Sequence, residues 1–276
     1  MSSSAAENIE INALVSEVPQ FKRRLHDIKA GISGVNFYPY DTLANLGLLD
    51  RLLTGENRRL LKLAAGKPMA DIGAADGDLA FFLEQQGSEV HIVDNAPTNH
   101  NQLKAARAVK EALASKVEIH DVDLDSQFHL PEKDYGLVLF LGILYHLKNP
   151  FYALEQLAKS SRHIVLSTRI AQYVAPPPQG LLVDIINRVG QYLPVVNRGD
   201  VSIEHSSLAY LVDDYECNND STNFWIFSPT GLRRILKRTG WDILDFTTVG
   251  EQTHSDPFSQ KADQRAFVLA RSRVLV

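Results

Sequence analysis

The chain has one cysteine, no long apolar run and no excess of basic residues. The single cysteine, Cys217, excludes an internal disulfide framework and is typical of a reducing compartment. No apolar segment reaches the length of about 20 residues that crosses a membrane, so no membrane span is expected. The 28 basic and 33 acidic residues give a formal charge of −5, which offers nucleic acid no general attraction. The nine histidines show no HxxxH spacing, and no catalytic metal is expected.

Length and composition predict one main domain. The 276 residues, 45% of them hydrophobic, can hold a full α/β domain plus an elaboration. Glu7 and Glu10 stand where a signal peptide would have a basic segment before an apolar run. The expected location is therefore the cytoplasm.

A strand, a glycine-rich loop and a helix are predicted around PMADIGAADG, residues 68–77, with the helix beginning near Asp78. Gly73 and Gly77 let the backbone come close to a ligand, and the following helix offers unpaired N–H groups. A dinucleotide fingerprint would have its second glycine where Ala75 stands, which weakens a pyrophosphate interpretation. An ordinary strand-loop-helix turn is the alternative.

Acids stand at the ends of three successive predicted strands. The strands are expected at residues 69–72, 89–93 and 117–122. Asp71 ends the first, Asp94 the second and Asp123 the third. An acid at the second of these places in an α/β unit hydrogen-bonds ribose hydroxyls, so Asp94 is predicted to bind the ribose of a nucleoside ligand.

The spacing DxGxxxG resembles motif I of the class I methyltransferases that use S-adenosylmethionine (SAM). In that family the acid at the end of the first strand serves the ammonium end of the cofactor, a role that the resemblance assigns to Asp71. The family also places a residue beside the adenine after the third strand, here Asp123. The candidate cofactor-binding residues are Asp71, Gly73, Ala74, Gly77, Asp94, Asn95, Asp123 and Tyr38.

The sequence YGLVLFLGILYHLKNP predicts a central strand that ends at the site. Residues 135–141 are apolar without alternation, as in a parallel strand covered on both faces. Ligands of open α/β sheets bind beyond the carboxyl ends of such strands, which places Gly142, Tyr145 and His146 at the mouth of the site. Tyr145 and His146 are the catalytic candidates. His146 has the chemistry to take a proton from an acceptor, although it can equally support the loop.

LGILYHLKNP is similar to the sequence after the fourth strand in the bacterial methyltransferase-like family that makes the carboxymethoxy group on the tRNA wobble uridine, and in its uncharacterised relatives. The resemblance extends from about Gly34 to Arg271 and includes SPTGLRRILKRTGW at 228–241 and RAFVLAR at 265–271. It implies that Tyr145 and Arg265 read the carboxylate of carboxy-SAM. The chain lacks the KGP setting of the family's upstream lysine, so SAM is the expected cofactor and carboxy-SAM the alternative.

A long insertion, residues 171–222, is not needed by the minimal fold. Its residues 182–193 predict a helix with one apolar face, which packs on its own domain, covers an apolar substrate or forms a homodimer contact. The tail of the insertion and the residues just after it supply the substrate candidates Asn218, Asn219 and Trp225, together with Arg265 from the last strand. Turn formation is the alternative role for this tail.

The expected fold is α/β: a Rossmann-like methyltransferase sheet of seven strands, the last antiparallel, with helices on both faces. Residues 1–55 are expected to form an N-terminal cofactor-covering segment. Residues 56–276 would form the SAM-binding domain, entered by a helix near 56–65 and carrying a substrate cap at 171–222. The expected function is SAM-dependent methyl transfer to a small-molecule acceptor. Transfer of methyl or carboxymethyl to the tRNA wobble uridine and non-catalytic SAM binding are the alternatives.

Overall fold

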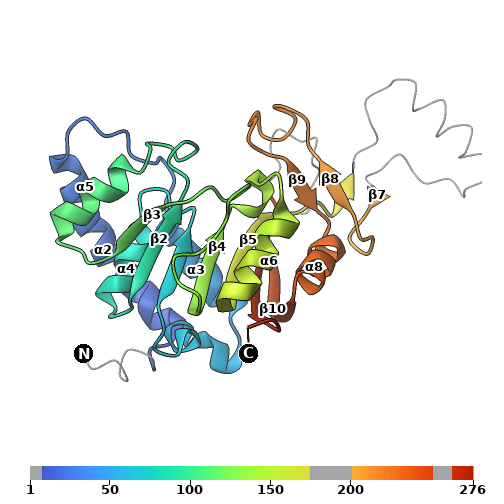
Figure 1. Ribbon diagram of the computed structural model, residues 1–276, viewed down its shortest axis with the longest axis horizontal. Helices are drawn as coiled ribbons and strands as arrows, with labels where there is room; N and C mark the ends of the chain where they lie inside the picture. The colour runs from blue at the N-terminus through green and yellow to red at the C-terminus, as the bar shows by residue number, and fades with distance from the viewer. Residues whose placement is uncertain (1–7, 175–200, 251–262, 276) are drawn as a thin grey trace, which may run out of the picture.

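The computed structural model describes residues 8–174, 201–250 and 263–275 (Figure 1). Its main sheet has the strand order β10-β11-β5-β4-β1-β2-β3. The strands are β1 (Met69–Ile72), β2 (Val90–Asp94), β3 (Glu118–Asp121), β4 (Tyr135–Leu141), β5 (Ser161–Arg169), β10 (Trp241–Val249) and β11 (Arg265–Ser272). Neighbours among β1 to β5 pair in parallel, whereas β11 runs antiparallel to both β5 and β10. The seven-stranded sheet with an antiparallel last strand is confirmed.

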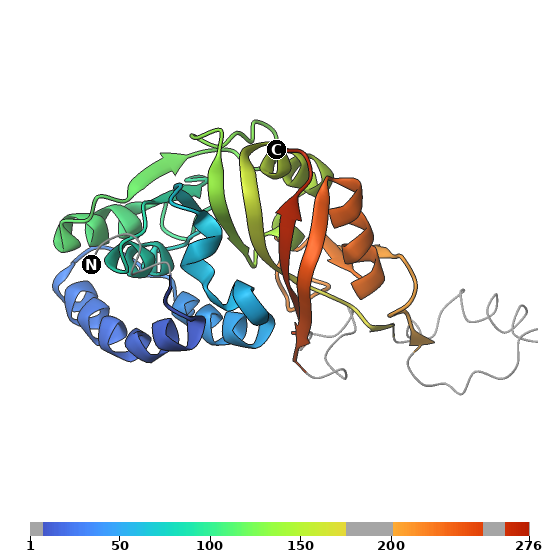
Figure 2. The same ribbon diagram turned by 90° about the horizontal axis from the view of Figure 1, so that it is seen from below.

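Helices cover both faces of this sheet (Figure 2). They are α2 (Ile11–Gly31), α3 (Asn45–Leu52), α4 (Asp78–Gln85), α5 (Lys104–Leu113), α6 (Pro150–Ser160) and α8 (Pro229–Arg238). Residues of α2, α3, α4 and α5 share one apolar core with Met69 of β1, and residues of α6 and α8 share the other core with Ala70. Because successive residues of a strand point to opposite faces, β1 and β4 contribute to both cores.

The N-terminal segment packs on the domain through α2. The buried residues of this helix recur at three- and four-residue spacing: Ile11, Leu14, Val18, Phe21 and Leu25. The Phe21 ring meets the Phe82 ring of α4 edge to face at 5.4 Å. This contact packs the middle of α2 on α4, the helix that follows the glycine loop.

The prediction of a helix near 56–65 is wrong. Two short 3-10 turns, Gly55–Arg58 and Leu60–Ala64, occupy this connection instead. Arg58 turns back to donate to the Asp50 carboxylate at 2.5 Å and to the Asp50 carbonyl at 3.0 Å. At the end of the second turn the Ala64 carbonyl packs so close to Gly136 that a Cβ there would lie 1.9 Å from it. Tertiary contacts therefore override a helical pattern in this connection.

The described parts of the insertion form two small antiparallel pairs. They are β6 (Tyr173–Val174) with β7 (Val201–Ser202), and β8 (Ala209–Leu211) with β9 (Trp225–Phe227). The Phe224 N–H, just before β9, donates to the Tyr145 carbonyl at 2.8 Å and so returns the chain to the end of β4. The helix predicted at 182–193 lies outside the described residues. No helix within the described residues is both long and apolar enough to cross a membrane.

Candidate functional site

A pocket of about 590 Å³ opens beyond the carboxyl ends of the parallel strands. Gly73 follows β1, Asp94 ends β2, Asp123 follows β3 and His146 follows β4, and all four line it. Tyr38 and Tyr40 from the segment after α2, Asp220 and Thr222 from the insertion, and Phe224 just after it complete its walls. The pocket therefore lies where the strand ends, the segment after α2 and the end of the insertion come together.

The glycine loop after β1 adopts backbone angles that favour glycine. Gly73 has φ +68° and Gly77 has φ +83°, both in the left-handed region. A Cβ on Gly73 would lie 2.1 Å from Cδ1 of Ile143, a residue that also lines the pocket. Of these two glycines Gly73 lines the pocket, while Gly77 precedes α4 and, like Ala74, does not.

Asp76 anchors this loop, although no prediction covered it. Its carboxylate accepts from the Lys29 ammonium at 3.0 Å, from the Tyr38 N–H at 3.0 Å and from Asn101 Nδ2 at 2.8 Å. The side chain is 3% exposed, so these three donors replace nearly all of its hydration. The only sequence signal for it was a further acid inside the glycine motif.

Asp94 is buried at the end of β2 and lines the pocket. Its oxygens accept from the Asn95 N–H at 2.8 Å and from Asn99 Nδ2 at 2.9 Å. Burial raises the pKa of this carboxyl, and the bonds from Asn99 and Asn95 oppose that effect. Each oxygen retains a lone pair, so the group can still accept from a ligand hydroxyl. Asn95 and Asn99 line the pocket too.

Asp123 lines the pocket but is engaged with its own loop. One oxygen accepts from the Asp125 N–H at 2.8 Å and the Ser126 N–H at 3.1 Å, and the other accepts from the Ser126 hydroxyl. These bonds, the Ser126 hydroxyl first, lower the pKa of Asp123. Its carboxylate therefore holds the rim of the pocket in place, and its role beside the adenine stays a prediction.

Asp71 lies beneath the loop and is not among the residues that line the pocket. Its side chain is buried and its Oδ2 atom has no hydrogen-bond partner among the described residues. Burial, with a smaller effect from the Asp94 charge, raises the pKa of Asp71 to about 7. The role towards an ammonium group that resemblance assigned to Asp71 stays a prediction.

His146 and Tyr145 lie in the 3-10 turn Leu144–His146 that follows β4. His146 Nδ1 is 2.9 Å from the Thr222 carbonyl oxygen and 3.0 Å from the Thr222 hydroxyl. Burial is the main cause that lowers the pKa of His146. Tyr145 is buried behind it, with ring centroids 4.1 Å apart, and does not itself line the pocket.

The predicted substrate residues lie around the pocket without lining it. A Cβ on Gly142 would be 3.8 Å from the Tyr145 hydroxyl and 4.0 Å from Nη1 of Arg265, so both polar groups lie near the end of β4. Asn218 and Asn219 have φ angles of +55° and +53°, as in the turn alternative. Trp225 Nε1 donates to the Lys148 carbonyl at 3.3 Å.

The pocket is acidic. Its charged walls are four aspartates and one lysine: Asp94, Asp123, Asp125, Asp220 and Lys148. Burial keeps His146 neutral near physiological pH because its pKa is lowered. Such a lining disfavours phosphate groups and favours a ligand that carries positive charge.

Comparison with known proteins assigns the chain to a family. A family model described as "Methyltransferase domain" matches residues 48–245, which is more than half of the chain. No curated protein matches the sequence. Among solved structures, the N-terminal domain of EvdMO1 in the presence of SAH and D-fucose is 17% identical, with 93% of this chain and 97% of that chain covered and a TM-score of 0.53.

Two further solved structures are similar to this chain. The N-terminal domain of EvdMO1 with SAH bound is 17% identical, covers 92% of this chain and 97% of its own, and has a TM-score of 0.52. Magnesium protoporphyrin IX methyltransferase from Synechocystis PCC 6803 is 17% identical over 75% of this chain and 74% of its own, at a TM-score of 0.42. At such identities the likeness to EvdMO1 shows the fold alone.

Proposed function

The chain belongs to the family of methyltransferase domains, and from this premise we propose that it transfers the methyl group of SAM to a small-molecule acceptor. The acidic pocket that joins Gly73, Asp94 and His146 carries this proposal. SAM supplies a methyl group made electrophilic by the sulfonium to which it is bonded. The protein then has to bind the two reactants, align them and exclude water, and such alignment can contribute about 7–11 kcal/mol to lowering the barrier.

The charge of the pocket fits this cofactor. SAM has a sulfonium and an ammonium against one carboxylate, so it carries net positive charge and no phosphate. Four aspartates against one lysine provide a matching negative lining. Asp94 offers ribose hydroxyls its free lone pairs, and Gly73 leaves the backbone open beside them.

His146 is suited to accept the proton of the acceptor. A carbonyl oxygen only accepts, so the contact with the Thr222 carbonyl assigns the ring proton to Nδ1 and leaves the lone pair on Nε2. Its lowered pKa keeps the ring neutral, which is the form that acts as a base. An acceptor hydroxyl or amine within hydrogen-bond reach of Nε2 would lose its proton to His146 as the new bond to carbon forms.

The acceptor side of the pocket is proposed to be the wall made by the insertion. Asp220 and Thr222 supply charge and a hydroxyl there, and Phe224, just after the insertion, adds an aromatic ring. The volume of about 590 Å³ lies within the range of about 300–1,000 Å³ typical of small-molecule sites. Residues 171–222 are thus proposed to act as an acceptor cap, and the segment up to residue 55 as a cover on the cofactor. Replacing Asp220, an insertion residue that lines the pocket, by asparagine should then reduce turnover and leave SAM affinity within a few-fold.

Native mass spectrometry of freshly purified protein, followed by calorimetry with SAM, tests the proposal. Co-purified SAM or saturable SAM binding is expected, together with methyl transfer to a compound in the small-molecule fraction of an extract. Binding of carboxy-SAM in place of SAM would redirect the cofactor assignment. Saturable SAM binding without turnover on any fraction would support the non-catalytic alternative, and the absence of SAM binding would contradict the proposal.

A further inference from the structure

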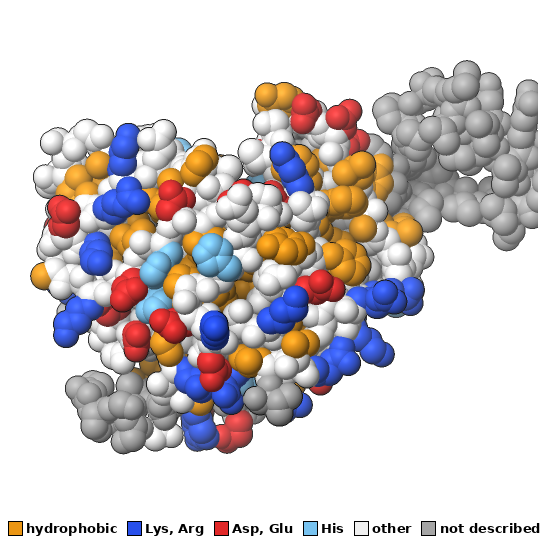
Figure 3. Space-filling view, viewed as in Figure 1, with side chains coloured by type: hydrophobic (Ala, Val, Ile, Leu, Met, Phe, Trp, Pro, Cys, Tyr) orange, Lys and Arg blue, Asp and Glu red, His pale blue; other side chains and the backbone are white. Residues whose placement is uncertain are grey.

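One face of the sheet is left without a helix at β2 and β3. The cover of that face, α6 and α8, lies over β4, β5 and β10, while the connection from β3 to β4, residues 122–134, contains no helix. His91 of β2 and His120 of β3 lie on this part of the face, beside the apolar residues that the connection supplies. Figure 3 shows histidine side chains close together there, in the region where Figure 1 draws β2 and β3.

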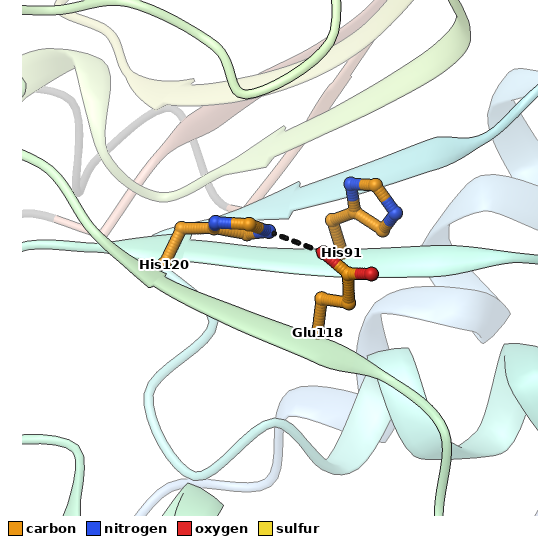
Figure 4. Close-up of side chains that lie close together, drawn as sticks. All are labelled: His91, Glu118 and His120. Atoms are coloured by element: carbon orange, nitrogen blue, oxygen red, sulfur yellow. Dashed lines mark ion pairs between the residues drawn. The ribbon is translucent and has the colours of Figure 1, made fainter.

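The strand register brings three metal-ligating residue types together on this face. β2 and β3 pair in parallel with His91 opposite Glu118 and Val93 opposite His120. Because alternate residues of a strand point to the same face, His91, Glu118 and His120 project to one side of the two strands (Figure 4). One ligand atom of each lies within 4.8 Å of those of the other two.

The donor atoms of this trio are already close. His120 Nε2 lies 3.2 Å from Glu118 Oε2, and the two imidazole rings have centroids 5.4 Å apart. Within the described residues, His120 Nε2 is buried and the Glu118 carboxylate is its neighbouring charged group. A cation bound here would take up the lone pair of the neutral imidazole and the charge of the carboxylate together.

We propose that His91, Glu118 and His120 bind a divalent transition-metal ion on the outer face of β2 and β3, separate from the methyl-transfer pocket. Two imidazoles and one carboxylate form a set that zinc commonly uses, and cobalt, nickel and copper accept the same ligands. The remaining positions of the ion are open to water.

The surroundings of His91 suit either ring nitrogen as the ligand. Its Nδ1 lies 2.8 Å from the Tyr135 hydroxyl and its Nε2 lies 3.6 Å from a carboxylate oxygen of Glu89. Whichever nitrogen binds the ion, the N–H of the other has an acceptor beside it, and such a partner orients a metal-bound histidine. The Glu89 and Glu118 carboxylates also supply negative charge for a cation.

The ion is assigned a structural role and not a catalytic one. β3 is a four-residue strand at the edge of the sheet, so a metal that joins it to β2 would restrain an element with few other contacts. Asp94, three residues after His91, lies about 10 Å further along the strand at about 3.3 Å per residue. Metal binding is therefore expected to raise the thermal midpoint without being required for methyl transfer.

The test titrates the chelator-treated full chain with zinc chloride against a chromophoric chelator. One zinc per chain is expected for the unmodified protein. Glu118→Gln and His120→Gln should each weaken zinc affinity at least about tenfold and abolish the rise in melting temperature that zinc produces. His26→Gln, at a histidine 84% exposed on α2, is the control and should bind zinc like the unmodified chain.

Glu118 is largely exposed, so its replacement by glutamine keeps the protein folded and the test decisive. Circular dichroism of the metal-free variants checks this directly. Zinc binding at less than one equivalent, or affinity in Glu118→Gln and His120→Gln equal to that of His26→Gln, would overturn the site. SAM affinity of Glu118→Gln is expected to equal that of the unmodified chain, so a failure here is separable from a failure of the proposed methyl transfer.

Discussion

The Lys29 ammonium lies 3.0 Å from a carboxylate oxygen of Asp76, which joins the last turn of α2 to the loop that lines the pocket. A second carboxylate, Asp78, is 2.8 Å away. Burial lowers the pKa of Lys29, but these two carboxylates outweigh it and raise the pKa overall. Asp76 also holds the Tyr38 N–H, so one buried ion pair positions both the glycine loop and the segment that follows α2.

Lys29→Met should lower the free energy of unfolding by about 1–3 kcal/mol and weaken SAM binding several-fold, because it leaves the buried Asp76 carboxylate without its counter-charge. Urea unfolding and calorimetry measure the two effects. The control is Lys22→Met on the same helix, since Lys22 pairs with Asp41 where both side chains are exposed to solvent. That pair should contribute only about 0.2–1 kcal/mol. Equal losses in the two variants would contradict the positioning role of Lys29.

Asp94→Ala is expected to weaken SAM binding at least about tenfold, since a lost charge-assisted hydrogen-bond pair costs about 1.5–3 kcal/mol. The matched control is Asp121→Ala. Asp121 ends the neighbouring strand opposite Asp94, and its carboxylate accepts from the Ala96 N–H without lining the pocket. Calorimetry should find the control within about threefold of the unmodified protein. Unchanged affinity in a folded Asp94→Ala variant would refute the ribose assignment.

The sheet was predictable because its strands have strong local patterns. The apolar run at 135–141 and the DxGxxxG loop each have one good structural interpretation, and both elements were placed correctly. The connection at 56–65 was mispredicted because Arg58 and Gly136 fix it through contacts with residues far away in sequence or on another element. Helix propensity depends on the local sequence and carries no information on such contacts.

The position of a pocket residue was predictable where it follows a strand and unpredictable where it lies on a distant loop. Gly73, Asp94 and His146 could be placed at the pocket because parallel strands end at one edge of the sheet. Asn99 and Asp220 reach the pocket from loops whose course depends on the whole fold, and their residue types are common in turns. Tyr145 and Arg265 lie near the pocket but do not line it. Their positions relative to the strands do not separate residues that line the pocket from residues behind it.

His146→Asn should reduce kcat by about 10²–10⁴-fold if the ring accepts the acceptor proton, with SAM affinity unchanged. The pH profile gives a second test. A base acts when neutral, and burial lowers the pKa of His146 below its ordinary value of 6.5, so activity should persist to below that pH and then fall on further acidification. His100→Asn, at another histidine of the pocket, is the control. If the activity of His146→Asn fell at the same acidic pH as that of the unmodified protein, the assignment of His146 as the base would be contradicted.

Asp71 should make the ligand-free protein less stable as pH rises. Its pKa is about 7 in the folded chain and about 3.9 when unfolded, so between these values the native state holds more protons than the unfolded state. The free energy of unfolding then falls with increasing pH through this window and levels off above about pH 7. Asp71→Asn removes the titrating group, and urea unfolding across the window should show a flatter dependence. If the free energy of unfolding changed with pH equally in the two proteins, Asp71 would not be the cause of the pH dependence.

The surface of the chain argues against tRNA as the acceptor. An enzyme that binds tRNA meets several phosphates with Lys and Arg, and each such contact lowers affinity by roughly 0.7–0.9 log units for a tenfold rise in salt. Several basic groups here already face acids: Lys22 pairs with Asp41, and Arg58 with Asp50. Figure 3 shows basic and acidic side chains interspersed on the face drawn.

Within the described residues, the exposed basic side chains of α8 form a surface that could oppose this conclusion, and they provide its test. They are Arg233, Arg234, Lys237 and Arg238. We expect mobility shifts with bulk tRNA to show no micromolar binding at moderate salt, and methyl transfer to appear in the small-molecule fraction. Micromolar binding with a steep salt slope that is lost in Arg234→Ala/Lys237→Ala would instead identify α8 as a phosphate-binding surface and make tRNA the acceptor. Weak binding insensitive to that double variant would leave the acidic pocket, and the small molecule it can enclose, as the site of methyl transfer.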